Sequence, residues 1–221
     1  MNTKNNLEKL NGVIIGESDY KEFDKLLTIL TKEKGKIKVY AFNVKRQNSK
    51  NIGKSRIFSF GTFELRLNGD KYHLENIILK NSFSELSNEY TNTCFASYFV
   101  ELIDYFSYEN MESENIYLLL YYTFKALIKQ KVPVKLIRRI FELKLLEYQG
   151  EYKESSNLSS ENKTLIYTWD FVLNTLPKNL YTFILSDEVF GLFDNEVRLE
   201  MKERVNKKFK SLNEINNYYE A

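Results

Sequence analysis

The first eighty residues alternate short apolar runs with polar breaks, a pattern typical of β-strands. The apolar runs lie at Gly12–Gly16, Leu26–Leu30, Ile37–Phe42, Ile57–Leu67 and Tyr72–Leu79. Residues 18–24 and 45–54 are polar and predict loops, while 33–36 and 68–70 carry glycines typical of hairpin turns. Gly61 predicts a bulge within its strand. Five antiparallel strands of this length indicate a small closed barrel, for which the OB-fold is the leading candidate.

Beyond Lys80 the apolar positions recur with the period of a helix. The first helical face carries Phe95, Phe99, Leu102, Ile103 and Phe106. Residues 116–131 are apolar on most sides and predict a central helix. Pro133 suits the first turn of the next helix, which we expect to end at Gly150.

The C-terminal part of the chain predicts two further helices. Residues 151–160 are poor in apolar side chains and predict a linker or loop. We expect Ser160 to cap a helix that ends before Pro177, and Ser186 to cap the last helix. The apolar positions of that last helix are Val189, Phe193, Val197, Met201, Val205 and Phe209.

Charge divides the chain between its two predicted domains. Residues 1–80 hold 16 Lys and Arg against 9 Asp and Glu, a balance of +7, and since the whole chain carries +2 the remainder carries −5. A basic β module offers a surface for phosphates, which an acidic helical region does not. We therefore predict an α+β protein, with an OB-fold nucleic-acid-binding domain at 1–80 and an all-helical domain at 81–221.

Composition excludes several other classes. The single cysteine, Cys94, excludes an internal disulfide and indicates a reducing compartment. With His73 as the one histidine, a structural zinc site lacks its usual ligands. The N-terminus has no apolar core of signal-peptide length, and the apolar run from Ile116 to Ile128 is interrupted by Lys125 and too short for a membrane span. We expect a soluble, cytoplasmic protein that binds no membrane.

The main candidate binding residues form a basic set along the predicted barrel. Its members are Lys36, Lys38, Lys45, Arg46, Lys50, Lys54, Arg56 and Arg66. Such groups give sequence-independent, salt-sensitive affinity for phosphates. The interleaved Tyr40, Phe42, Phe58 and Phe60 offer stacking faces to unpaired bases. The alternative is a solvated loop on a basic barrel whose aromatic residues belong to the core, and Phe58 and Phe60 share one face.

Other candidate chemistry is weak. Gly53-Lys54-Ser55 resembles the end of a phosphate-binding loop, but the upstream glycine is missing and no helix is predicted after it. His73 falls in a strand without a nucleophile nearby, and Cys94 is typical of a small buried apolar residue. Glu101 and Asp104 are spaced like neighbours on a solvated helix face. No catalytic constellation emerges, which favours a binding protein without a cofactor over an enzyme.

Several segments, taken in order, resemble RecO, the family of bacterial recombination mediators. They are Asp24–Thr28, Thr31–Ile37, Lys45–Lys50, Phe58–Leu65, Ala96–Asp104, Arg139–Leu146 and Phe209–Leu212. Their order and spacing extend over nearly the whole chain. The resemblance implies an N-terminal OB-fold and a helical C-terminal domain. It also implies a non-enzymatic role in DNA repair: binding single- and double-stranded DNA, annealing strands and, with RecR, helping to load RecA onto DNA coated by single-stranded-DNA-binding protein.

The resemblance also assigns residues. The family's basic loop after the third strand falls on Lys45, Arg46 and Lys50. Asn43 stands where the family usually has a glycine, and Asn tolerates left-handed backbone geometry better than most residues. The family arginine that receives the acidic tail of the single-strand-binding protein falls on Arg139, with Lys135 and Arg138 near enough to assist. The alternative for Arg139 is an ordinary surface arginine on an amphipathic helix.

The chain departs from the family pattern after Gly150. Many RecO proteins carry a four-cysteine zinc module there, whereas residues 151–160 contain no cysteine. We therefore expect a loop in place of the zinc module and no bound metal.

Two other classes of function remain open. One is a protein-interaction scaffold whose basic barrel binds an acidic partner in place of DNA. The other is a metal-dependent nuclease that uses clustered carboxylates, although no cleavage motif supports it.

Overall fold

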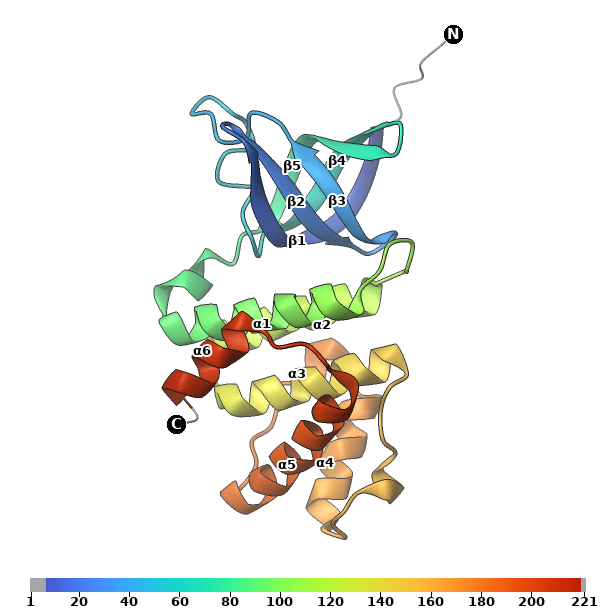
Figure 1. Ribbon diagram of the computed structural model, residues 1–221. Coiled ribbons are helices and arrows are strands. Elements are labelled where there is room, and N and C mark those ends of the chain that lie inside the picture. Colours follow the sequence, from blue (N-terminus) through green and yellow to red (C-terminus); the bar gives the residue numbers. More distant parts are fainter. Residues whose placement is uncertain (1–6, 220–221) are drawn as a thin grey trace. The chain divides into compact units, whose positions relative to one another are not determined.

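A computed structural model describes residues 7–219 of the chain (Figure 1). The strands are β1 (Leu7–Lys21), β2 (Asp24–Thr31), β3 (Gly35–Ala41), β4 (Phe60–Asn68) and β5 (Lys71–Asn81). The helices are α1 (Tyr90–Phe106), α2 (Glu114–Lys129), α3 (Val134–Gln149), α4 (Lys163–Asn174), α5 (Asp187–Arg204) and α6 (Lys210–Tyr219). The predicted fold class is confirmed, since a five-stranded barrel is followed by a helical region.

The described residues form two compact units. Residues 7–84 and 100–117 make up the first unit, and residues 85–99 and 118–219 the second. Within the second unit, α3 packs against both α4 and α5, and these two helices also contact each other. No helix among residues 7–219 has the length and apolar character needed to cross a bilayer.

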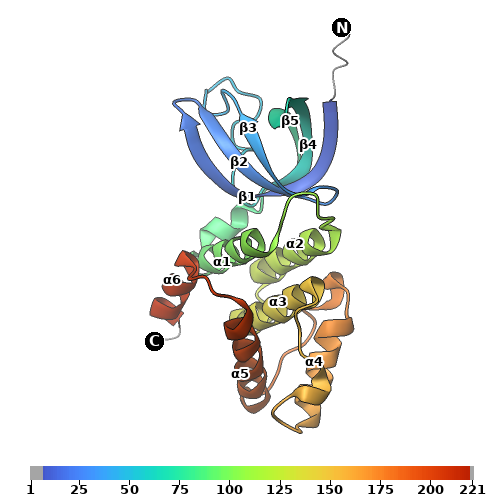
Figure 2. The same cartoon turned by 45° about the vertical axis from the view of Figure 1, so that its right-hand side comes forward.

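The five strands close into a barrel in the order β1-β2-β3-β5-β4, and β4 pairs back onto β1. Figure 2 shows the long, curved β1 that takes part in both pairings. β3 and β5 are parallel, with Val39 opposite Tyr72 and Tyr40 opposite His73. The prediction of a wholly antiparallel sheet is therefore wrong at this pair. A closed ring with an odd number of strands cannot alternate direction all the way round, so one pair must run parallel.

The predicted loop at 18–24 is also wrong, because β1 continues to Lys21 and only two residues turn the chain into β2. The side chains of residues 17–21 are all exposed. These residues are polar because both faces of the hairpin are open to solvent at this end. Backbone hydrogen bonds hold the two strands together there without an apolar face. The bulge expected at Gly61 is confirmed by the register shift between Phe60 and Gly61 in the β4–β5 pair.

The barrel encloses one apolar core, which includes Leu10, Ile14, Leu27, Ile29, Ile37, Val39, Ala41, Val44, Phe63, Leu65, Tyr72 and Ile77. In β3 the core residues alternate with Lys38 and Tyr40, which point outward as the period of two requires. The predicted solvated face of β3 is thus confirmed, and it is the face on which candidate binding residues gather.

The β2–β3 hairpin also pairs with the segment that follows α1. The Lys36 N–H donates to the Tyr108 carbonyl at 3.0 Å, and the Asn110 N–H donates to the Lys34 carbonyl at 2.9 Å. Gly35 has φ +67°, and a Cβ at this position would collide with the Tyr108 carbonyl. Only glycine combines this left-handed geometry with so close an approach of the neighbouring backbone.

Local signals predicted most of the helices correctly. The apolar face of α1 is buried, and Gly150 ends α3 in the left-handed conformation with φ 71°. The prediction that Ser160 caps α4 is wrong. The Asn162 side chain accepts the N–H groups of Thr164 and Leu165, while Ser160 accepts the N–H of Asn162. Ser186 caps α5 as expected by accepting the Val189 N–H.

The prediction of a single last helix through Phe209 is wrong. α5 ends at Arg204, Val205 is extended, and α6 begins at Lys210. The break leaves Phe209 buried, with its ring centroid 5.8 Å from that of Tyr98. Burial of this ring against α1 therefore outweighs the local preference for a continuous helix.

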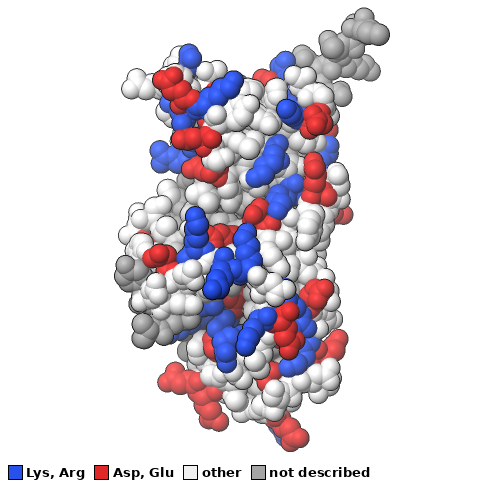
Figure 3. All heavy atoms as spheres, in the orientation of Figure 1, with Lys and Arg blue, Asp and Glu red and all other residues white. Residues whose placement is uncertain are grey.

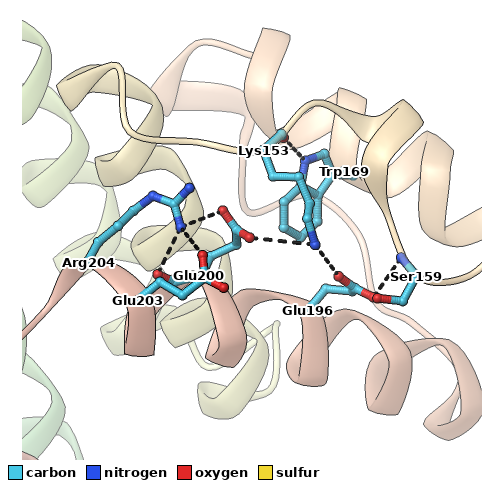
Figure 4. A network of polar contacts seen from close by, with 7 residues as sticks. All are labelled: Lys153, Ser159, Trp169, Glu196, Glu200, Glu203 and Arg204. Atoms are coloured by element: carbon cyan, nitrogen blue, oxygen red, sulfur yellow. Dashed lines mark hydrogen bonds and ion pairs between the residues drawn. The ribbon is translucent and has the colours of Figure 1, made fainter.

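Residues 151–160 contain one short 3-10 turn at Ser155–Asn157 and are held by a polar network (Figure 4). The Trp169 indole N–H donates to the Lys153 carbonyl at 2.8 Å, and Lys153 Nζ lies 3.0 Å from Glu196 Oε2. The Ser159 N–H donates to the other oxygen of Glu196 at 3.0 Å. The network ties this segment to α4 and α5. Within residues 7–219 no cluster of His, Cys, Asp or Glu is arranged to hold a metal ion.

Candidate nucleic-acid interface

An aromatic platform lies on the outer face of the barrel. Its members are Tyr20 at the end of β1, Tyr40 in β3, Phe42 directly after β3, and His73 in β5. Tyr40 is central: its ring centroid lies 5.1 Å from that of Tyr20, 6.3 Å from Phe42 and 6.0 Å from His73. Phe42 and His73 are also in contact, with centroids 5.2 Å apart. The parallel pairing of β3 with β5 places Tyr40 opposite His73 and so builds this surface.

The platform is open to solvent. Tyr20 is 48% exposed and Phe42 is 42% exposed, although burial of such rings would be favourable. Tyr20 and Phe42 each contact Tyr40, and exposed rings gathered in this way are typical of a binding site. The exposed rings of Tyr20 and Phe42 offer surfaces on which an unpaired base can stack, and such stacking is worth about 1–3 kcal/mol per base.

Cations border the aromatic rings. Lys71 Nζ lies 5.7 Å from the centroid of Tyr40, and Lys21 Nζ lies 5.5 Å from that of Tyr20. These lysines are attracted by the ring faces and place positive charge next to the platform. Lys38, on the same outward face of β3 as Tyr40, is also exposed. Aromatic stacking surfaces bordered by cations are the combination that single-stranded nucleic acid requires.

A second aromatic–cation pair lies at the turn between β1 and β2. The Arg46 guanidinium lies 4.9 Å from the ring centroid of Phe23, and both side chains are exposed. The Lys45 N–H donates to the Phe23 carbonyl at 3.1 Å, which fixes the start of the basic loop against the turn. Asn43 has φ 55°, so the expected left-handed turn is confirmed.

The predicted basic set divides into paired and unpaired members. Lys36, Lys45 and Arg66 form ion pairs with Asp104, Asp19 and Glu75, at 3.1, 2.9 and 3.0 Å. Lys54 donates to the Ile77 carbonyl at 3.3 Å. Lys38, Arg46, Lys50 and Arg56 are exposed and pair with no carboxylate among residues 7–219, although Lys38 Nζ donates to Thr28 Oγ1 at 2.6 Å. On the face of the barrel seen in Figure 3, basic and acidic side chains are interspersed. The set therefore presents fewer unpaired charges than its size suggests.

The predicted aromatic residues separate in the same way. Phe58 and Phe60 are buried, so for these two the alternative of core residues is correct. Tyr40 and Phe42 belong to the exposed platform. Sequence reasoning missed Tyr20, which stands in the segment taken for a loop, and it missed the role of His73. Only the pairing of β3 with β5 brings His73 to Tyr40.

Arg138 and Arg139 lie in a buried polar cluster of the second unit. Arg138 Nε donates to Glu142 Oε1 at 2.9 Å, and Arg139 Nη1 donates to Glu142 Oε2 at 2.8 Å. Arg139 Nε also donates to Asp194 at 2.6 Å, and the Tyr98 hydroxyl donates to Glu142 at 2.6 Å. The alternative of an ordinary surface arginine is wrong for Arg139, because its side chain is only 5% exposed.

The cluster shifts the ionisation of its carboxylate. Burial by itself would raise the pKa of Glu142, but the two arginines outweigh this effect and hold the pKa at about 2. Burial also raises the pKa of Tyr98, and the adjacent carboxylate raises it further. Both guanidinium groups are thus already matched to a carboxylate inside the protein.

Lys135 is the exposed member of the predicted tail-binding set. It lies at the start of α3 on a pocket of about 250 Å³ that is also lined by Pro133, Leu136, Leu185, Asp187 and Phe190. The pocket is mainly apolar and has one cation and one carboxylate at its wall. The apolar part of this lining suits an aromatic side chain.

Comparison with known families identifies both parts of the chain. A family model described as "Recombination protein O N terminal" matches residues 5–83. A second, described as "Recombination protein O C terminal", matches residues 87–169. Together the two models extend over most of the chain, including every strand of the barrel and helices α1 to α3.

Individual relatives agree. The chain is similar to proteins called "DNA repair protein RecO" from two bacteria. It is 33% identical to the protein from Caldicellulosiruptor bescii over 144 residues (65% of this chain) and 34% identical to that from Clostridium perfringens over 139 residues (63% of this chain). The relative from Alkaliphilus metalliredigens is 28% identical over 165 residues, 75% of this chain. The chain spans 59%, 56% and 67% of the lengths of these three relatives. On the two family models and these relatives, the chain belongs to the RecO family.

Proposed function

We propose that this chain is a DNA-binding recombination mediator that contacts DNA through its barrel domain, residues 1–80. The observation that carries the proposal is the exposed platform of Tyr20, Tyr40, Phe42 and His73 with lysines at its border. Relatives named as DNA repair proteins support the same class of function. The protein needs no catalytic group for this role, because stacking and charge neutralisation involve no bond making.

The platform favours unpaired strands as the first substrate. Rings that point outward from a convex barrel can stack on bases that are splayed apart, whereas the bases of a duplex are already stacked on each other. The exposed cations Lys38, Lys50, Arg46 and Arg56 supply contacts to phosphates, which single and double strands share. Holding strands by backbone and ring faces leaves the base edges free to pair. We therefore propose strand annealing as the activity that follows from this mode of binding.

Family membership supports a wider role. We propose that the chain acts with RecR to help load RecA onto DNA coated by single-stranded-DNA-binding protein. Annealing of complementary strands, measured with and without that coating protein, tests this role directly. Absence of annealing under both conditions would contradict the mediator role and would be consistent only with a protein that binds DNA.

We also propose that the acidic tail of the single-strand-binding protein docks at the start of α3. Arg139 and Arg138 were the expected contacts, but their buried pairs make Lys135 the accessible cation. The pocket beside Lys135 has room for an aromatic ring. Lys135→Ala is expected to weaken binding of an acidic peptide ending in Phe, measured by fluorescence anisotropy, while Lys163→Ala leaves it unchanged. Equal binding by both variants would show that the tail does not dock at Lys135.

The platform itself is tested with a double variant, Tyr20→Ala with Phe42→Ala. Each ring that stacks a base contributes about 1–3 kcal/mol, so affinity for oligothymidylate is expected to fall at least tenfold. The matched control is Tyr108→Ala with Tyr167→Ala, which removes two rings that are 66% and 70% exposed outside the platform. Equal losses in the two double variants would contradict the proposal.

A further inference from the structure

We propose that a lysine-lined pocket at the C-terminal end of α2 binds phosphate groups of nucleotides. The pocket has a volume of about 220 Å³ and lies wholly within the second unit. Its walls come from the end of α2, the residues directly after it, and the segment around residues 178–182. The pocket is separate in sequence from the barrel surface, and a phosphate site here does not depend on the function proposed for the barrel.

The charge of the pocket is one-sided. Lys125, Lys129, Lys131 and Lys178 line it, and no Asp or Glu is among its lining residues. All four lysines are exposed, and none pairs with a carboxylate of residues 7–219. Four ammonium groups around so small a volume repel one another, and a bound anion relieves that repulsion.

Two less exposed lysines of the same unit pair with carboxylates. Lys144 pairs with Glu147 at 2.9 Å, and Lys153 pairs with Glu196 at 3.0 Å. Residues 81–221 carry a net charge of −5, so carboxylates are plentiful in this part of the chain. Carboxylates are thus available to pair with lysines in the helical region, but none lines this pocket. Such a local excess of positive charge within an acidic domain points to an external anion.

Aromatic and hydroxyl groups complete the wall. The Tyr181 hydroxyl lies 2.5 Å from Thr123 Oγ1, and Thr123 donates its own proton to the Leu119 carbonyl at 2.7 Å. The hydrogen bond between the two hydroxyl groups holds the Tyr181 ring at the pocket wall. Tyr122 lines the pocket as well, and Lys125 Nζ lies 6.0 Å from its ring centroid. Fixed rings beside cations offer a sugar or base a surface next to its phosphate.

The lining favours phosphate over carboxylate. Lysine binds phosphate as a point charge, whereas the paired hydrogen bonds that best recognise a carboxylate need an arginine fork, and no arginine lines the pocket. Four cations exceed the single charge of one phosphodiester, so the pocket suits consecutive phosphates of a strand or the several charges of a free nucleotide. These two sources share the same chemistry and are separated by experiment.

The first experiment measures binding of fluorescent oligothymidylate against salt concentration. The pocket variant is Lys129→Ala with Lys178→Ala, and the control is Lys163→Ala with Lys202→Ala, which removes the same charge from exposed positions outside the pocket. Each lost contact to a single strand lowers the log–log slope by about 0.7, so the pocket variant is expected to lose about 1.4 and the control nothing.

The second experiment locates the contact in the full-length, unaltered protein. An oligonucleotide carrying iodouracil is cross-linked by light, and adducts are expected on Tyr122 or Tyr181, and to be lost in the pocket variant. Adducts on Tyr20, Tyr40 or Phe42 report the barrel surface separately, so failure of one site is distinguished from failure of the other. Suppression of the pocket adduct when millimolar ATP is present during irradiation, with inorganic phosphate as a weaker competitor, would identify a free nucleotide as the source.

Two results would overturn the proposal. One is the absence of adducts on Tyr122 and Tyr181 together with equal salt slopes for the pocket and control variants. The other is suppression of adduct formation by a glutamate-rich peptide, but not by nucleotides, present during irradiation, which would make the pocket a site for acidic protein. Thermal unfolding of each variant shows whether the fold is retained, and the cross-link in the unaltered protein does not depend on it.

Discussion

At the scale of single residues, the charged side chains that we expect to affect the free energy of unfolding most are buried in α3. Glu142 is almost fully buried, yet it stays ionised because Arg138 and Arg139 surround it. A buried ion pair of this kind costs a large desolvation energy, and removal of one partner typically destabilises a protein by about 3–5 kcal/mol. Arg139→Glu would therefore test folding more than it tests binding of an acidic tail.

The first prediction at this scale concerns pH. The pKa of Glu142 is about 2 in the folded protein, below the ordinary value of 4.5 that applies when the chain is unfolded. Its carboxylate thus contributes stability that is complete above about pH 5 and is lost as the pH falls toward 2. Each pKa unit corresponds to about 1.4 kcal/mol, so the contribution is on the order of 3 kcal/mol.

Urea unfolding between pH 7 and pH 2 measures this contribution. Glu142→Gln is expected to be less stable at pH 7 and to lose less stability on acidification than the unaltered protein. Other carboxylates with lowered pKa values, such as Glu196, remain in both proteins and cancel in the comparison. Parallel stability curves for the two proteins would contradict the prediction.

At the scale of elements, segment 151–160 shows how side chains can fix a connection that has little regular structure. Lys153 joins it to α5, with Nζ 3.0 Å from Glu196 and 3.6 Å from Glu200, and these two carboxylates are 3% exposed (Figure 4). Many relatives are expected to carry a zinc module at this place in the chain. In this protein an ammonium group holds together two acidic side chains and the backbone of the connection.

Lys153→Met is expected to destabilise the protein by on the order of 2 kcal/mol, because it leaves the buried Glu196 without its cation, whereas Glu200 keeps Arg204 at 2.8 Å. Trp169 is the one tryptophan of the chain and donates to the Lys153 carbonyl, so its fluorescence reports the connection directly. A red shift of its emission should accompany the fall in stability. Lys163→Met, at an exposed lysine of α4, serves as the control. Unchanged emission and melting temperature would show that the ion pairs are dispensable.

At the scale of the whole molecule, a net charge of +2 conceals an uneven distribution of free charge. Three of the eight predicted barrel cations are already paired with carboxylates. In the second unit, a group of four lysines is left unpaired. Figure 3 shows basic side chains gathered over the end of α5 and its connection to α6. In the proposed function, electrostatic attraction of DNA would therefore depend on particular unpaired groups more than on the net charge of each domain.

The salt dependence of DNA binding tests this view. Arg46→Ala is expected to lower the log–log slope for a single strand by about 0.7, since Arg46 is exposed and unpaired. Lys45→Ala is expected to lower it less, because Lys45 already neutralises Asp19 and holds the pKa of that carboxyl below its usual range. An equal or larger effect of Lys45→Ala would mean that this ion pair opens when DNA binds.

Local sequence signals determined the number of strands, most of the helices, the stop at Gly150 and the cap at Ser186. Each of these depends on residues only a few positions apart, so the sequence pattern contains the information. The same pattern placed Tyr40 and Lys38 on the solvated face of β3. The resemblance to RecO came from the order of short segments, and the family models agree with it.

The tertiary structure decided which of these residues act together. The parallel pairing of β3 with β5 brought His73 to Tyr40, and helix packing buried Arg139 where an amphipathic pattern had left it on the surface. Lys129 and Lys178 share a pocket although they are far apart in the chain. Such contacts between distant residues depend on how helices and strands pack and on which charges can be buried as ion pairs. Local propensity does not encode these energies, and only the folded chain reveals them.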